Sequence, residues 1–190
     1  MTALIDPKKY TQTLERLRSF FLAKNFLEVH TQNRLSILAA CEDPETVATY
    51  NYGGNIWPLP QTGQMWLEYE LLKNPDAPGF FCLSTSYRAE PNPVPGRHET
   101  IFPMFEFEMH GDVHDLKVME IELCEHLGIP LDPENIKTYG EWQDKYSVRE
   151  LDHGHEAAIG RGMITEFPEW TSPFWNMSRN GDGTSRKIDV

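Results

Sequence analysis

The sequence predicts an α+β fold in which an antiparallel β-sheet is flanked by helices. Residues 80–90 form an apolar run that breaks into alternation, and residues 100–109 alternate throughout, which is typical of strands. The loop between them contains three prolines and a glycine, so neither a helix nor a strand ladder continues through it. Apolar residues recur at helical spacing before and after this pair, within residues 6–25 and 116–127.

The first expected helix begins at Asp6. An aspartate followed by proline supplies a capping side chain and then the residue that best suits the first helical position. Residues at helical spacing follow: Tyr10, Leu14, Leu17 and Phe21. Residues 26–29 then have the composition of a short strand.

Composition and charge narrow the class of protein. The chain has 190 residues and 39% hydrophobic content, which is enough for one globular domain over residues 1–190. A net charge of −12 argues against a nucleic-acid binder that works through a broad basic surface. Three cysteines at wide spacing fit reduced thiols. We see no signal peptide and no membrane-spanning run, so we expect a cytoplasmic protein without a membrane partner.

The two expected strands give the sheet one apolar and one mixed face. Residues 101, 103, 105, 107 and 109 are apolar and share the face that we expect to be core. Phe102, Met104, Glu106 and Glu108 share the other face, where an aromatic ring next to two carboxylates suits a binding floor. A solvated sheet face carrying one Arg–Glu pair is an equally good interpretation of this spacing.

Basic residues lie at the far end of the same strand pair. Arg88 and Glu90 share the face of Phe102 if the strands pair as an antiparallel hairpin. A guanidinium there can form two hydrogen bonds to a phosphate, and the Phe102 ring can stack on a flat base. Arg97 and His98 lie in the loop, from which they would fold over a polyphosphate. These residue types predict a nucleotide site.

The same residues resemble motif 2 of the class II aminoacyl-tRNA synthetases, and they are closest to the aspartyl, asparaginyl and lysyl subclass. The matching positions are Arg88-Ala89-Glu90, the proline-rich loop, Arg97-His98, Phe102 and Phe105-Glu106-Phe107-Glu108. The resemblance implies an ATP site made by Arg88, Glu90, Arg97, His98 and Phe102. In it Arg88 is the catalytic contact to the α-phosphate, and Phe102 stacks on adenine. The chain departs from the motif at Ile101, where the family has glutamate, and at Met104, where glutamine is frequent.

A second stretch, residues 59–68, resembles the amino-acid-binding element of the asparaginyl enzymes. It matches that form through Gly63, Gln64, Leu67 and Glu68. The resemblance implies that Gln64, together with Glu106 and Glu108, binds the amino acid. Leu67 replaces a lysine that aspartyl enzymes use against a side-chain carboxylate, so a neutral side chain is expected to be preferred. Trp66, Tyr69 and Leu72 are equally typical of an ordinary amphipathic helix packed on the sheet.

The ends of the chain carry weaker parts of the resemblance. Residues 17–32 resemble motif 1, which builds the dimer interface, so we expect a homodimer, although Gln32 replaces the family's proline. Residues 185–190 begin a strand in which Asp189 matches the first acidic ligand of Mg²⁺. Motif 3 does not occur, which implies a core that is cut short before it. Because the first expected helix starts almost at once, we expect no anticodon-binding domain in residues 1–190.

The second half of the sequence has simpler signals. Gly128 and Pro130 are expected to end the helix that contains residues 116–127. We expect helices at 141–146 and 156–161, a strand at 162–168, core residues at 172–176 and a turn at 180–183. Two groups have metal-ligand residue types, but neither has the spacing of a known zinc site. They are His110, Asp112, His114 and Asp115, and residues 152–156.

We therefore expect ATP-dependent activation of an amino acid, with asparagine or aspartate favoured, as an aminoacyl-adenylate. The cofactors are ATP and Mg²⁺, and the acceptor is tRNA or another molecule. One alternative is a non-catalytic binding or regulatory module that resembles a synthetase. Another is amidation of aspartate, as in asparagine synthetases of this type.

Overall fold

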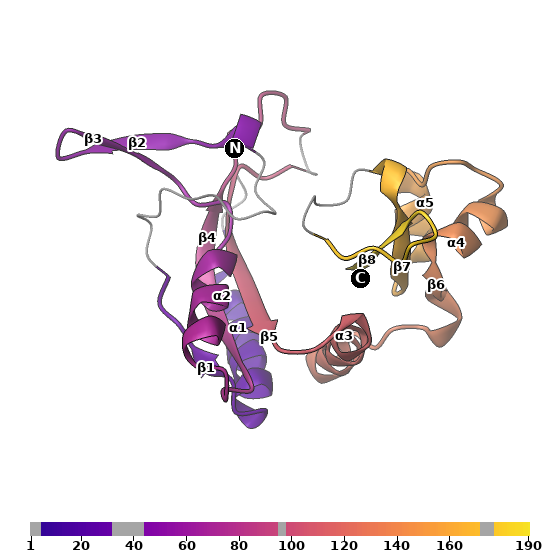
Figure 1. Cartoon of the computed structure of the whole chain (residues 1–190), viewed down its shortest axis with the longest axis horizontal. Helices are drawn as coiled ribbons and strands as arrows, with labels where there is room; N and C mark the ends of the chain where they lie inside the picture. The colour runs from indigo at the N-terminus through magenta and orange to yellow at the C-terminus, as the bar shows by residue number, and fades with distance from the viewer. Residues whose placement is uncertain (1–4, 32–43, 95–97, 172–176) are drawn as a thin grey trace. The chain divides into compact units, whose positions relative to one another are not determined.

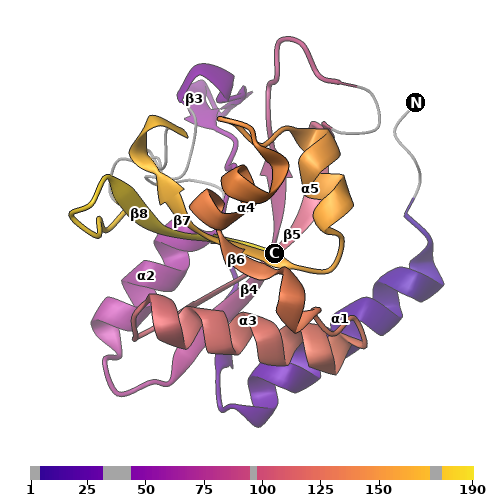
Figure 2. The same cartoon turned by 90° about the vertical axis from the view of Figure 1, so that its right-hand side faces the viewer.

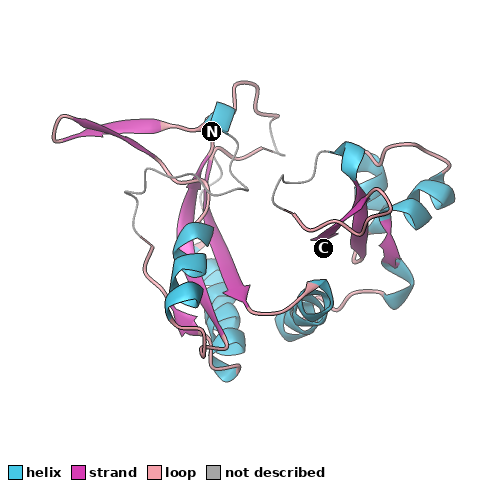
Figure 3. Cartoon of the chain, in the orientation of Figure 1, coloured by secondary structure: helices cyan, strands magenta, loops and turns pink. Residues whose placement is uncertain are grey.

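The computed structural model describes residues 5–31, 44–94, 98–171 and 177–190. The chain divides into two compact units, residues 1–110 and 111–190 (Figure 1). Each unit combines helices with a small sheet, as Figure 3 shows, and the α+β prediction is confirmed. One catalytic domain across residues 1–190 stays a prediction. No helix in the described ranges is long and apolar enough to cross a membrane.

A three-stranded sheet forms the centre of the first unit. Its strands are β1 (Leu27–Glu28), β4 (Gly79–Tyr87) and β5 (Ile101–Met109), in the order β1-β4-β5. β1 is parallel to β4, and β4 is antiparallel to β5 along the whole length of both strands. The hairpin expected around the proline-rich loop is therefore confirmed.

Helix α1 (Pro7–Ala23) covers one face of this sheet. Asp6 caps it as expected, because its carboxylate accepts hydrogen bonds from the backbone N–H groups of Lys8 and Lys9 at 2.9 and 3.2 Å. The fully buried Phe21 ring packs against the rings of three sheet residues. They are Phe81, Phe105 and Phe107, with centroid distances of 5.6, 5.4 and 4.9 Å. Ile101, at the other end of β5, is 57% exposed, so the expected core face is core only where α1 covers it.

Helix α2 (Gln64–Lys73) packs against β4 and β5. Leu67 and Leu71 are buried in a cluster with Phe80 and Cys82. The expected packing face of Trp66, Tyr69 and Leu72 is wrong, since Leu72 is 82% exposed. Both the expected residues and the two buried leucines have near-helical spacing. Leu67 and Leu71, four residues apart, are the pair that faces the sheet.

A separate hairpin between α1 and α2 was not expected from the sequence. It pairs β2 (Thr49–Tyr52) with β3 (Asn55–Pro58) after a short 3-10 helix, Pro44–Thr46. Gly53 and Gly54 form its turn with φ values of 60° and 82°, which favour glycine. The adjacent glycines were the sequence signal for this turn. The strands themselves were hard to predict, because their large apolar residues Tyr52 and Ile56 are exposed and form no buried face.

The second unit begins with α3 (Val113–Leu127), which Gly128 ends in a left-handed conformation as expected. Its sheet has the order β6 (Ile136–Thr138), β7 (Met163–Pro168), β8 (Thr184–Asp189), with β6 parallel and β8 antiparallel to β7. Helices α4 (Tyr139–Tyr146) and α5 (His153–Ile159) follow β6, and α4 packs on β7 (Figure 2). Trp142 is fully buried in the resulting core. Short 3-10 helices occupy Pro133–Asn135 and Glu169–Thr171.

The helix expected at 141–146 and the strand expected at 162–168 correspond to α4 and β7, whereas the helix expected at 156–161 lies three residues earlier at its start and ends at Ile159. The turn at residues 180–183 contains Gly181 and Gly183 at positive φ, and the Asp182 carboxylate accepts from the Thr184 backbone N–H at 3.0 Å. The expected core residues 172–176 lie outside the described ranges.

Candidate functional site

The face of the first sheet that α2 approaches carries the predicted floor. Strand register places Glu108 opposite Phe80, Glu106 opposite Cys82 and Phe102 opposite Ser86. Because side chains alternate along a strand, Phe102, Glu106 and Glu108 share this face. The structure thus brings these three sequence-predicted residues onto one surface of the first unit.

Arg88 lies at the open end of this floor, one residue beyond β4. Its guanidinium carbon is 5.4 Å from the centroid of the Phe102 ring, which is a cation–π distance. Its backbone N–H donates to the Thr100 carbonyl at 2.8 Å, so the residue is held as an extension of the strand ladder. The side chain is exposed. An ordered backbone and an accessible guanidinium beside an aromatic ring suit an anionic, ring-bearing ligand.

The other predicted nucleotide-binding residues are less well defined. Glu90 is half-buried two residues after Arg88. His98 is exposed, and its backbone N–H donates to the Val94 carbonyl at 2.9 Å. Arg97 lies outside the described residues. Their contact with a nucleotide stays a prediction.

Glu106 is tied into the protein by three donors. Its carboxylate accepts from the Thr62 hydroxyl, from the Gly63 backbone N–H at 2.7 Å and from the Ser84 hydroxyl at 3.0 Å. The Cys82 sulfur lies 4.0 Å away. Burial raises the pKa of the Cys82 thiol to about 12, and the negative charge of Glu106 adds to this effect. The thiol therefore stays protonated at neutral pH.

Glu108 is the acid of the floor whose ionisation falls near neutral pH. Burial raises its pKa to about 7 against the opposing effect of a hydrogen bond with Gln64, while the charges of Glu68 and Glu106 raise it further. Gln64 starts α2 and Glu108 lies on β5, so this contact joins two predicted amino-acid-binding residues. A carboxylate that ionises near pH 7 beside an amide suits recognition of an ammonium group.

Asp189, the predicted metal ligand, belongs to the second unit. It ends β8, and Lys187 Nζ lies 2.7 Å from its carboxylate. Burial and the charge of Asp189 together raise the pKa of Glu120 to about 7. The second unit therefore brings two carboxylates close enough to influence each other electrostatically.

The two sequence groups with metal-ligand residue types serve as helix caps. Asp112 and Asp115 form a capping box at the start of α3, and Asp152 with His155 does the same for α5. Backbone hydrogen bonds lower the pKa of Asp112 and of Asp152. Among the described residues, no group of three or more metal-binding side chains occurs.

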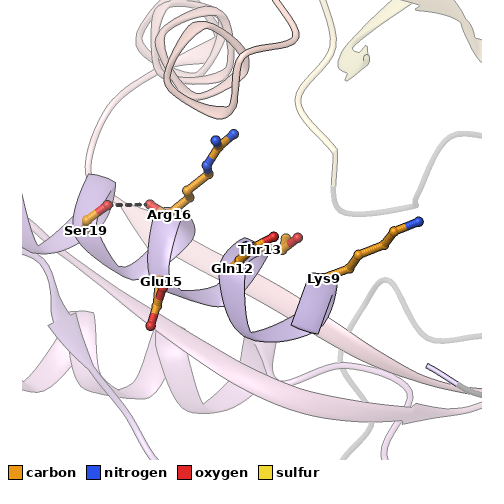
Figure 4. Close-up of a pocket in the computed structure, with 6 residues that line it drawn as sticks. All are labelled: Lys9, Gln12, Thr13, Glu15, Arg16 and Ser19. Carbon is orange, nitrogen blue, oxygen red and sulfur yellow. Dashed lines mark hydrogen bonds between the residues drawn. The ribbon is translucent and has the colours of Figure 1, made fainter. Parts of the chain in front are cut away.

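A hollow of about 660 Å³ lies elsewhere in the first unit, along α1 (Figure 4). Its lining includes Lys9 and Arg16, and the Ser19 hydroxyl donates to the Arg16 carbonyl at 2.8 Å. It contains none of the residues that the sequence assigns to the nucleotide or the amino acid. We therefore place the candidate site on the sheet floor and not in this hollow.

Sequence reasoning missed the residues that support the floor, Thr62 and Ser84. Thr62 lies directly before the glycine that precedes α2, and Ser84 lies two residues from Cys82 on the same strand face. Strand alternation was the signal that would have placed Ser84 beside Glu106.

Comparisons with known proteins support the fold. No protein-family model and no curated protein sequence matches the chain. Solved structures do match. Asparaginyl-tRNA synthetase from Pyrococcus horikoshii, complexed with asparaginyl-adenylate, has a TM-score of 0.73 and 18% identity, over 93% of this chain and 48% of that one. Asparaginyl-tRNA synthetase from Entamoeba histolytica, also in complex with asparaginyl-adenylate, has a TM-score of 0.74 and 17% identity, over 94% of this chain and 47% of that one.

An aspartyl enzyme shares the same architecture. Aspartyl-tRNA synthetase from Entamoeba histolytica has a TM-score of 0.67 and 18% identity, over 93% of this chain and 40% of that one. The chain thus has the α+β fold seen in asparaginyl- and aspartyl-tRNA synthetases, as the sequence predicted, and spans about half the length of those solved chains or less.

Proposed function

We propose that this chain is part of an enzyme that activates an amino acid with ATP as an aminoacyl-adenylate. The observation that carries the proposal is the shared sheet face on which Arg88 lies over Phe102 at one end, with Glu106 and Glu108 near Gln64 at the other. The cation and the aromatic ring suit the phosphates and the base of a nucleotide. The two acids and the amide suit an amino acid. The two solved asparaginyl enzymes complexed with asparaginyl-adenylate have the same fold.

The chemistry requires no protein base. The carboxylate of the amino acid attacks the α-phosphorus of ATP, the bond to the β-phosphate oxygen breaks, and pyrophosphate leaves with that electron pair. Arg88 would stabilise the charge that develops on the α-phosphate, and Phe102 would fix the adenine by stacking. His98 and Arg97 would contact the outgoing pyrophosphate, and Glu90 would line the nucleotide side of the floor.

Mg²⁺ is part of this proposal, with Asp189 as its protein ligand. Mg²⁺ is usually held by one or two carboxylates together with phosphate oxygens, so Asp189 on β8 would suit it if its carboxylate gave up the ion pair with Lys187. The ion would supply charge neutralisation on the phosphates. The acceptor of the activated amino acid would be tRNA or another small or protein nucleophile. The free, buried Cys82 and Cys124 are consistent with work in the cytoplasm.

Asparagine is the substrate that we favour. The charges of Glu68 and Glu106 both act on Glu108, which bonds Gln64, and a further carboxylate from aspartate would add repulsion. Leu67 occupies the position of the lysine in aspartyl enzymes, but its side chain is fully buried against the sheet. Leu67 would therefore affect selectivity only because no cation stands at this position, and not through a contact with the substrate.

Pyrophosphate exchange tests the proposal. The reaction is run with labelled pyrophosphate, ATP and each amino acid separately, and asparagine is expected to support exchange at least about tenfold better than aspartate. A tenfold preference for aspartate would overturn the choice of substrate and favour the aspartate-amidating branch. Adenylate formation with neither amino acid would overturn the activation proposal.

A further inference from the structure

Helix α2 begins without a side-chain cap of its own. Its N-cap residue is Gly63, which has no side chain to accept the free N–H groups of the first turn. The carboxylate of Glu106, on β5, binds the backbone N–H of the N-cap residue itself. It accepts directly from the Gly63 N–H at 2.7 Å. An anion at this end also complements the helix dipole.

The same carboxylate reaches Gln64 through Thr62. The Gln64 backbone N–H donates to the Thr62 hydroxyl oxygen at 3.1 Å, and that hydroxyl donates onward to Glu106. The direct bond uses one carboxylate oxygen and the bond from Thr62 uses the other. Glu106 thus holds two successive backbone N–H groups at the start of α2.

The other side of the carboxylate is fixed to the neighbouring strand. The Ser84 hydroxyl on β4 donates to it at 3.0 Å. Space is also tight, because a Cβ atom on Gly63 would lie 2.8 Å from the Cys82 sulfur, 2.9 Å from Thr31 and 3.1 Å from Glu106. The start of α2 is therefore pressed against both strands at one defined position.

We propose that Glu106 is a positioning residue that sets Gln64, and not a group that contacts the substrate. Both of its oxygens already accept hydrogen bonds from the protein, whereas Glu108 on the same face bonds only the Gln64 side chain among the partners described. Glu106 fixes the backbone of Gln64, and Glu108 fixes its side chain. This role differs from the direct contact that the sequence resemblance implies, and its effect on catalysis rests on the proposed function.

The position of Gln64 is expected to matter for the amino acid and not for ATP. Loss of the Glu106 network would leave the Arg88–Phe102 end of the floor in place. The KM for the amino acid should therefore rise, while the KM for ATP and the value of kcat stay nearly unchanged. A residue that only stabilised the fold would lower the amount of active protein and leave both KM values alone.

The decisive variants are Thr62→Val and Thr62→Ser. Valine has the shape of threonine without its hydroxyl, and serine keeps the hydroxyl. Glu106→Gln is the direct variant, and the Thr62 pair keeps the test informative if that protein fails to fold. Thr138→Val is the matched control, because the Thr138 hydroxyl caps α4 in the second unit by accepting from the Glu141 N–H at 3.1 Å.

Hydrogen exchange and steady-state kinetics supply the two readouts. Thr62→Val should speed exchange at the Gln64 amide, whose acceptor is the Thr62 hydroxyl, by about tenfold and raise the KM for the amino acid by a similar factor. Thr62→Ser should restore both, and Thr138→Val should change only the amides at the start of α4. Equal exchange and equal KM values for Thr62→Val and the wild type overturn the inference. Hydrogen exchange needs no activity, so a chain inactive with every amino acid overturns the proposed function alone.

Discussion

The guanidinium of Arg88 and the ring of Phe102 are in cation–π contact, with 5.4 Å between the guanidinium carbon and the ring centroid. One residue follows β4 and the other lies near the start of β5, so the strand pairing itself brings them together. A nucleotide that binds here would insert its base against the ring and its phosphates beside the cation.

Replacement of Arg88 by alanine tests this arrangement. Arg88→Ala is expected to lower pyrophosphate exchange by two to three orders of magnitude, roughly the effect of losing one charge-stabilising donor in a transition state. Phe102→Leu should instead raise the KM for ATP by about tenfold with little change in kcat, because it removes stacking only. Equal exchange rates for Arg88→Ala and the wild type would remove Arg88 from the catalytic step.

The ionisation of Glu108 predicts a pH dependence of amino-acid binding. Its pKa is raised to about 7, so the carboxylate is mostly protonated at pH 6 and mostly ionised at pH 8. An ionised Glu108 attracts the substrate ammonium, so the KM for the amino acid should fall as pH rises through about 7. Glu108→Gln should have a high KM with a flat profile. The same profile in both proteins would show that Glu108 does not report on the bound amino acid.

Glu120 predicts a pH dependence of stability in the second unit. One of its carboxylate oxygens is buried and has no hydrogen-bond partner among the described residues, and its pKa is raised to about 7. The folded state therefore holds this proton more tightly than the unfolded state, whose pKa is 4.5. The contribution of Glu120 to the free energy of unfolding is favourable at low pH and is lost as pH rises through about 7.

Glu120→Gln should thus make the protein more stable than the wild type at pH 8, by about 1–2 kcal/mol, and the gain should shrink below pH 5. Chemical denaturation at both pH values measures it. Glu125→Gln, an exposed position on the same helix, is the control and should have no such effect. A pH-independent difference between Glu120→Gln and the wild type would contradict the assignment.

A homodimer is expected through α1 and β1. Leu22 on α1 and Leu27 on β1 are each 54% exposed, and β1 lies at the edge of its sheet. Light scattering at tens of micromolar should give twice the mass of the chain. Leu27→Glu should shift this toward the monomer, whereas Val118→Glu, at an exposed position on α3, should not. A monomer mass for the wild type would refute the prediction.

Local signals accounted for most elements of the fold. Asp6-Pro7 marked the start of α1, Gly128 marked the end of α3, and the proline-rich loop marked the β4–β5 hairpin, because each depends on a few adjacent residues. The rotation of α2 was not predictable in this way. Leu67 and Leu71 compete with Trp66 and Leu72 for the sheet, and the choice is made by contacts across the fold.

The floor shows the same limit. Alternation placed Phe102, Glu106 and Glu108 on one face, as the strand register has them. Alternation could have placed Ser84 beside Glu106, but Thr62 was beyond such reasoning because it lies 44 residues away in sequence and outside the two strands. Residue types alone gave both acids the same role, and only the geometry separates an internally bonded carboxylate from one that ionises near pH 7.

The spacing of the two acids along β5 restricts how this protein can vary in length. One residue inserted between Glu106 and Glu108 would shift the strand pairing by one position and turn the following side chains to the opposite face. The β2–β3 turn has no such restriction, because a Cβ atom on Gly53 or Gly54 would meet nothing within 4 Å. Homologous sequences should therefore differ in length at this hairpin tip and keep the length of β5 constant.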